Sequence, residues 1–122
     1  MKGRPPSRAI KEALGLAKLR GLVHQCVSDP ERLYDITIVG VRPIAFIRVM
    51  YAPEIPAALS KILNDFRKEI RLLRLISPDA TESLELWLRS KHGTWRLFRV
   101  VGDSIAEIDR DGKLLAAKPV PA

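Results

Sequence analysis

Cysteine and histidine are nearly absent from this chain: its 122 residues include one cysteine, Cys26, and two histidines. A single cysteine excludes an internal disulfide, and one Cys with two His falls short of a zinc site. So little cysteine is typical of a reducing compartment, and we therefore expect a cytoplasmic location. The charged N-terminus lacks the apolar stretch of a signal peptide, and no apolar run approaches the length of a membrane span. We expect neither secretion nor a membrane partner.

The sequence also lacks the signatures that identify many enzymes. It has no internal repeat, Gly-rich phosphate loop, zinc knuckle or Ser-His-Asp order. What remains is the composition of one small domain, because 122 residues with 47% hydrophobic side chains can bury a core. Within this domain we expect a basic arm over residues 1–6, a core over 7–101, a β extension over 102–117 and a frayed tail over 118–122.

Positive charge is in excess and is concentrated at one end of the chain. The formal net charge is +7, of which residues 1–20 contribute +5. A basic end of this kind attracts polyanions through long-range steering and counterion release, which favours nucleic acid as a partner. The alternative is that the excess of Lys and Arg only keeps a small protein soluble.

A first amphipathic helix is predicted from residue 7 to about residue 21. Its polar face carries Arg8, Lys11 and Lys18, with Gly15 in the gap between the last two. A basic stripe of this kind is either a solvated surface or a surface that binds phosphates, and the sequence leaves both interpretations open.

A second, longer helix is predicted to begin between Pro53 and Pro56 and to continue to about Ile76. Its apolar stripe is nearly continuous, and the opposite face is basic. Asp65 and Glu69 lie within helical reach of these cations, so we expect part of the charge to be neutralised locally. The basic residues on this face are Arg67, Arg71 and Arg74, with Lys61 and Lys68 beside them.

Strands are predicted from alternating or continuous apolar runs bounded by turn residues. They cover residues 22–27, 34–40, 44–51, 83–89, 94–101, 104–109 and 114–117. The segment 44–51 is apolar on both sides apart from Arg48, which is typical of a central strand covered by helices. We therefore predict an α/β domain with a central mixed β-sheet, two main helices and a C-terminal β-hairpin across Asp111 and Gly112.

The order of these elements, αβββαββ, resembles the restriction-endonuclease-like fold. Over residues 7–100 the chain is similar to a diverged member of the PD-(D/E)xK nucleases, the superfamily that includes archaeal Holliday-junction resolvases. The resemblance rests on an opening helix that ends at Gly21, Asp35 in an apolar strand, the central strand 44–51, the long helix after it and the closing Trp95-Arg-Leu-Phe98.

The resemblance implies a metal site, and this chain lacks half of it. In the family a strand Asp and the Glu of a Glu-x-Lys motif hold a divalent ion, usually Mg²⁺, and the Lys positions or activates water. Here Asp35 matches the Asp, but Phe46 and Arg48 stand at the Glu and Lys positions. Phe cannot bind a metal, and Arg stays protonated and cannot accept a proton. We predict that Arg48 instead forms an ion pair with Asp35, with no cofactor.

A carboxylate from elsewhere in the chain is the alternative route to a metal site. The candidates are Glu54 at the start of the second helix, Asp65 and Glu69 farther along it, and Glu12 in the first helix. Most acidic residues on helices face solvent. A second carboxylate beside Asp35 would indicate an active Mg²⁺-dependent endonuclease, whereas Arg48 beside Asp35 would oppose it.

The remaining candidates have competing interpretations. His24 and Cys26 lie on one face of a predicted strand. They could act as a thiol-imidazole pair or serve as structural residues, and we favour the structural role. His92 lies beside a turn glycine and is expected to serve the turn. Trp87 and Trp95 either offer a platform on which bases stack or pack against each other across strands, and we favour packing.

The leading functional prediction is a catalytically inactive nuclease-like domain that binds nucleic acid through its basic helix faces. The resemblance favours DNA over RNA and implies a homodimer, although the residues themselves neither choose the nucleic acid nor show an interface. Two alternatives stay open: an active Mg²⁺-dependent endonuclease or junction resolvase, and a protein-interaction scaffold with no nucleic-acid role. The residues predicted to contact phosphates are Arg4, Arg8, Lys11, Lys18, Arg67, Arg71 and Arg74.

Overall fold

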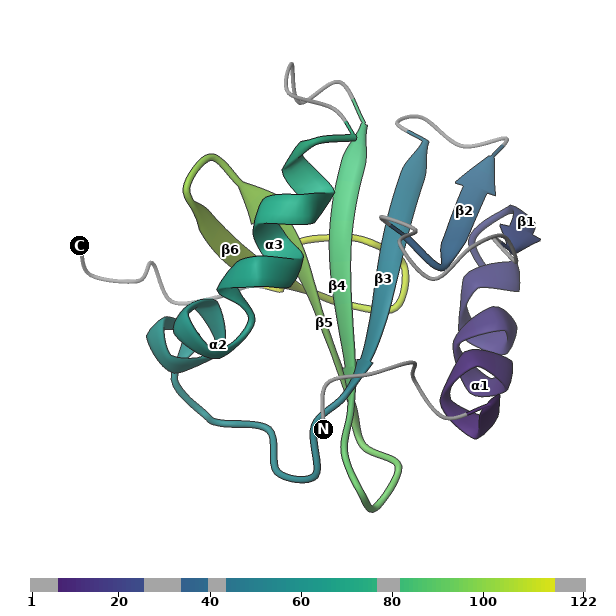
Figure 1. Cartoon of the computed structure of the whole chain (residues 1–122). Coiled ribbons are helices and arrows are strands. Elements are labelled where there is room, and N and C mark those ends of the chain that lie inside the picture. Colours follow the sequence, from purple (N-terminus) through teal and green to yellow (C-terminus); the bar gives the residue numbers. More distant parts are fainter. Residues whose placement is uncertain (1–6, 26–33, 40–43, 77–81, 116–122) are drawn as a thin grey trace.

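A six-stranded mixed β-sheet forms the centre of the fold (Figure 1). The computed structural model describes residues 7–25, 34–39, 44–76 and 82–115. The strands lie in the sheet in sequence order, and every neighbouring pair is antiparallel except β3 and β4, which are parallel and joined through α2 and α3. The elements are α1 (Ser7–Lys18), β1 (Leu22–Gln25), β2 (Ile36–Val39), β3 (Ala45–Tyr51), α2 (Leu59–Asp65), α3 (Arg67–Arg74), β4 (Ser83–Arg89), β5 (Trp95–Val101) and β6 (Ser104–Ile108).

The helices cover opposite faces of this sheet. On one face α1 lies beside β1 to β3, and on the other α2 and α3 cross β3, β4 and β6 (Figure 1). Successive strand residues alternate between the faces, so β3 contributes to both cores. The first core joins Ala9, Ala13 and Ala17 of α1 to Ala45, Ile47 and Val49 of β3. The second joins Ile62, Ile70 and Leu73 of the other helices to Leu84, Leu86 and Leu88 of β4.

The predicted long helix is wrong in two respects. In the structure the helical segment begins only at Leu59, after non-helical residues. It is divided into α2 and α3 at Phe66, where φ is −113° and ψ is 25°. Pro53 and Pro56 disfavour the α conformation at the residues before them, Ala52 and Ile55, and therefore disfavour a helix start before Pro56. The side chain of Phe66 is buried in the core beneath the helices. No Gly or Pro occurs between residues 57 and 76, so the sequence carries no local signal for this interruption.

The C-terminal strand β6 extends the sheet. β6 pairs with β5 across a turn at Gly102, whose φ is +57°. The hairpin predicted across Asp111 and Gly112 is reduced to a bridge between Ile108 and Leu114, and residues 116 and 117 lie outside the described residues.

The coarse prediction of an α/β domain with a mixed sheet between helices is confirmed, with three helices in place of two. Residues 83–89 form β4 as predicted, and β3 lies in the interior of the sheet. Within the described part of the chain, no helix is long and apolar enough to cross a membrane.

Candidate nucleic-acid interface

Asp35 lies directly before β2 and is held against β3. Its side chain is 1% exposed. The backbone N–H of Asp35 donates to the carbonyl of Ile47 at 2.7 Å, and the N–H of Val49 donates to Asp35 Oδ2 at the same distance. Arg48 Nε lies 4.0 Å from Oδ2, so the predicted ion pair is present at the long end of the range. A buried carboxylate that accepts a backbone N–H and lies beside a guanidinium is partnered within the protein.

Phe46, at the position that the resemblance assigns to a metal-binding Glu, takes part in packing. Its ring contacts Tyr34 edge-on, with centroids 5.0 Å apart, and it packs against the core beneath α2 and α3. Period-two alternation places Arg48 on the same face of β3. An aromatic ring and a guanidinium therefore occupy the side of β3 that the resemblance assigns to metal ligands.

The other candidate carboxylates differ in their surroundings. Among the described residues, no three His, Cys, Asp or Glu side chains lie together so as to hold a metal ion. Glu12 of α1 binds Arg89, and Glu54 is exposed. Glu69 differs from them: it is 5% exposed on the inner side of α3, and its Oε1 accepts no hydrogen bond.

Glu54 and Asp65 instead line an open hollow of about 410 Å³ at the end of β3. Asp65 also pairs with Lys61 at 3.6 Å, one helical turn away. The rest of the lining is mainly apolar, from Ala52, Phe66 and two prolines, together with Tyr51.

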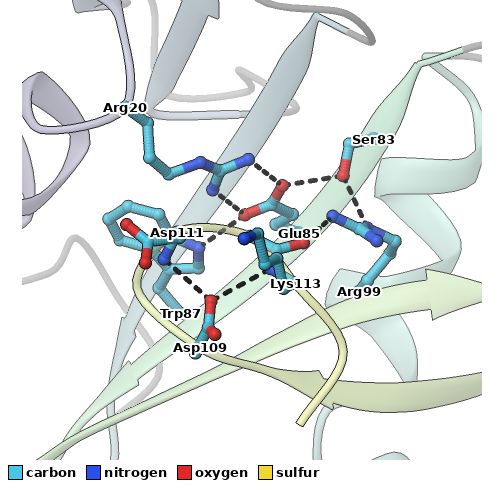
Figure 2. A network of polar contacts seen from close by, with 9 residues as sticks. Arg20, Ser83, Glu85, Trp87, Arg99, Asp109, Asp111 and Lys113 are labelled. Carbon is cyan, nitrogen blue, oxygen red and sulfur yellow. Dashed lines mark hydrogen bonds and ion pairs between the residues drawn. The ribbon is translucent and has the colours of Figure 1, made fainter.

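A buried polar network that no sequence pattern predicted lies on the side of the sheet that α1 covers (Figure 2). Glu85 of β4 is fully buried and receives two hydrogen bonds from the guanidinium of Arg20, at 2.7 and 2.9 Å. Its oxygens also accept from the hydroxyl of Ser83 at 2.7 Å and from Trp87 Nε1 at 3.0 Å. Arg99 donates to Ser83 Oγ at 2.9 Å. The only signal in the sequence is an acidic residue between two leucines of a strand.

The loop after β6 closes over this network. Oδ1 of Asp109 accepts the backbone N–H groups of Asp111 and Lys113 at 2.9 and 3.0 Å, which folds the loop (Figure 2). The carbonyl of Gly112 accepts a hydrogen bond from Arg99. A Cβ at Gly112 would lie 2.7 Å from Arg20 Nη2, so loop and guanidinium are in close contact.

A second ion pair joins α1 to the β4–β5 hairpin. Arg89 donates to the two oxygens of Glu12 at 2.9 and 3.1 Å, and Trp95 Nε1 donates at 3.1 Å. The hydrogen bond from Arg89, followed by that from Trp95, lowers the pKa of the Glu12 carboxyl. Trp95 also contacts the fully buried Trp87 edge-on, with centroids 6.4 Å apart. The predicted packing of the two tryptophans is therefore confirmed.

The cations predicted to bind phosphates fall on two separate surfaces. We call the exposed set Arg8, Lys11 and Lys18 the α1 face, and the exposed set Arg67, Lys68 and Arg71 the α3 face. Arg74 is only half exposed and pairs with Asp103 at 3.5 Å. Arg4 lies outside the described residues, as does Cys26, while His24 and His92 are exposed.

The cations of these two faces differ from those against the sheet in their partners. The sheet-facing arginines bind protein groups: Arg20 binds Glu85, Arg48 lies beside Asp35, Arg89 binds Glu12, Arg96 binds Glu107, and Arg99 binds Ser83 and the Gly112 carbonyl. Within the described residues the α1 and α3 faces make no ion pair, and only Arg67 makes a side-chain hydrogen bond, to Asn64 Oδ1.

Comparisons with known proteins add no relative: protein-family models, curated proteins and solved structures gave no match.

Proposed function

We propose that this chain is a nuclease-like domain that binds nucleic acid and does not cleave it. The observation that carries the proposal is the division of the cations: those against the sheet bind protein carboxylate, hydroxyl or carbonyl oxygens, whereas those on the α1 and α3 faces form no ion pair with any other described residue. Exposed like charges on one helix repel each other and contribute little to stability. A bound polyanion neutralises these cations, and the cations in turn release counterions condensed on its phosphates, which favours binding.

The α1 face has the shape that such contacts need. Arg8 and Lys18 are ten residues apart on α1, or about 15 Å along the axis of a regular helix. A duplex carries one negative charge per about 1.7 Å of axis, so this length faces several phosphates. A Cβ at Gly15 would meet no atom within 4 Å, so the surface between Lys11 and Lys18 is open and smooth.

The nuclease-like part of the proposal rests on the strands around Asp35. Three antiparallel strands are followed by a helical crossover to a parallel fourth, and Asp35 lies where the second meets the third. Phe46 packed against Tyr34, and Arg48 beside Asp35, support a site without the family's metal-ligand set.

The proposal is tested by a matched pair of lysines. Lys11→Gln removes a cation of the α1 face, whereas Lys61→Gln removes one that is already paired with Asp65. Fluorescence anisotropy with a labelled duplex across a salt series should show the slope of log K against log salt falling by about 0.9 for Lys11→Gln. Lys61→Gln should keep the wild-type slope. Equal slopes for wild type and Lys11→Gln would show that Lys11 does not contact phosphates. No binding of the duplex at low salt would contradict the proposal.

Metal-dependent cleavage is the second candidate, because Glu69 is a buried carboxylate with an unbonded oxygen on the inner side of α3. Its test is incubation of labelled duplex and branched DNA with Mn²⁺ or Mg²⁺. Cleavage that disappears in both Asp35→Asn and Glu69→Gln would replace the first proposal by this one.

A further inference from the structure

The two basic faces point in opposite directions. The buried alanines of α1 pack against one face of the sheet, and the buried residues of α3 pack against the other. α1 and α3 cover different sides of the sheet (Figure 1). The exposed cations of each helix lie away from its buried residues, so the α1 face and the α3 face lie on opposite sides of the molecule. The helices are also displaced sideways, with α1 over β1 to β3 and α3 over β3 and β4.

The separation of these faces makes them electrostatically independent. A helix with its side chains is about 10–12 Å across, so two helix layers and a sheet put the outer faces more than about 20 Å apart. The Debye length at physiological ionic strength is about 8 Å, so phosphates on one face hardly affect the other. The two faces can therefore be occupied at the same time without mutual repulsion.

One duplex cannot reach both faces. Duplex DNA stays straight over lengths far below its persistence length of about 150 base pairs, and a sharp bend around so small a domain costs several kcal/mol. We infer that the protein bridges two duplex segments, one on the α1 face and one on the α3 face. This inference rests on the proposed nucleic-acid binding and adds a second, independent site.

The experiment separates bridging from binding. A biotinylated duplex of about 20 base pairs, too short to fold back on itself, is held on beads and offered a fluorescent duplex of the same length. Three full-length proteins are compared: wild type, Lys11→Glu/Lys18→Glu for the α1 face and Lys68→Glu/Arg71→Glu for the α3 face. Circular dichroism and thermal unfolding verify that each variant is folded. Direct binding of one duplex is measured in parallel by anisotropy.

The expected result is capture of the fluorescent duplex by wild type, with a maximum at intermediate protein concentration and a loss at excess protein. Each double variant should still bind one duplex in the anisotropy assay, while its capture falls to the level without protein. Wild-type binding without capture would overturn the bridging inference and leave the proposed function standing. Capture by either double variant would also overturn it, because one face would then bridge through self-association. Absence of binding in both assays would overturn the proposed function itself.

Discussion

Arg20 and Glu85 are 65 residues apart in the sequence and form an ion pair on the side of the sheet that α1 covers. Two hydrogen bonds join them, from Arg20 Nη1 to Glu85 Oε1 at 2.7 Å and from Nη2 to Oε2 at 2.9 Å. The Arg20 side chain is 9% exposed and that of Glu85 is 0% exposed. The pair joins the segment after α1 to the centre of β4, and the loop carrying Gly112 covers it. The end of α1, the sheet and the C-terminal loop are thereby held together by one buried contact.

Removal of either partner of this pair should destabilise the fold strongly. In Glu85→Leu the guanidinium of Arg20 loses its carboxylate, and in Arg20→Met the buried carboxylate of Glu85 keeps only its neutral donors. Each single change should lower the free energy of unfolding by about 3–5 kcal/mol, because an unpaired charge is left in the interior. The double variant should be more stable than either single one. Urea unfolding of all four proteins measures this, and strictly additive losses would contradict the coupling.

Two glycines should respond in opposite ways to substitution by alanine. Gly112→Ala places a Cβ 2.7 Å from Arg20 Nη2 at a φ of +85°, so we expect a loss of about 1–3 kcal/mol. Gly15→Ala adds a methyl group to open space on the surface of α1, where alanine favours the helix by about 1 kcal/mol. Thermal unfolding should therefore show a lower Tm for the first variant and a higher Tm for the second. A stable Gly112→Ala protein would mean that the loop can move away from Arg20.

The Glu12–Arg89 pair should make stability depend on pH in the acid range. The pKa of Glu12 is lowered from its ordinary value of 4.5, first by the hydrogen bond from Arg89. The unfolded chain therefore binds more protons than the folded one between the two values, and stability rises with pH there. The contribution is complete above about pH 4.5 and is lost as the pH falls through the lowered pKa.

Glu12→Gln should accordingly flatten the acid side of the stability profile. Urea unfolding of wild type and variant between pH 3 and pH 7, on the two sides of the ordinary pKa of 4.5, makes the comparison. Identical profiles for the two proteins would show that the pair contributes nothing to the pH dependence.

Glu69 should be a source of instability. Its Oε1 is buried on the inner side of α3 without a hydrogen bond, and desolvation of such a group costs about 1–3 kcal/mol. Glu69→Leu replaces it with an apolar side chain among core residues such as Ile70 and Leu73, and the free energy of unfolding should rise by about 1–2 kcal/mol. A destabilised Glu69→Leu would indicate that the carboxylate has a structural or ligand-binding role.

Local patterns accounted for much of the fold, and the resemblance to the nuclease family supplied the expected contact between Asp35 and Arg48. The alternation of apolar and polar residues, together with turn residues, predicted β3, β4 and β5. The same period of two predicted that Phe46 and Arg48 lie on one face of β3. The Trp87–Trp95 contact followed from adjacent strands in the same way. These features depend on residues close together in sequence or on a regular strand register.

Other features depend on tertiary contacts that no local pattern carries. Phe66 interrupts the helix without a Gly or Pro and with its side chain buried in the core. The Glu85 network needs partners as distant as Arg20, so Glu85 looked like an ordinary polar residue in an alternating strand. The opposite placement of the two basic faces depends on which side of the sheet each helix covers, and the sequence does not specify this.

The most direct test of the central claim is one measurement of binding and integrity on the same labelled duplex in Mn²⁺ buffer. Anisotropy across a salt series is followed by gel analysis of the recovered DNA, for wild type and for Lys11→Gln/Lys18→Gln. We expect binding by wild type that weakens steeply with salt, a slope smaller by about 1.8 in the double variant, and uncut DNA throughout. Cleaved DNA, or no measurable binding of duplex or single strand at low salt, would contradict it.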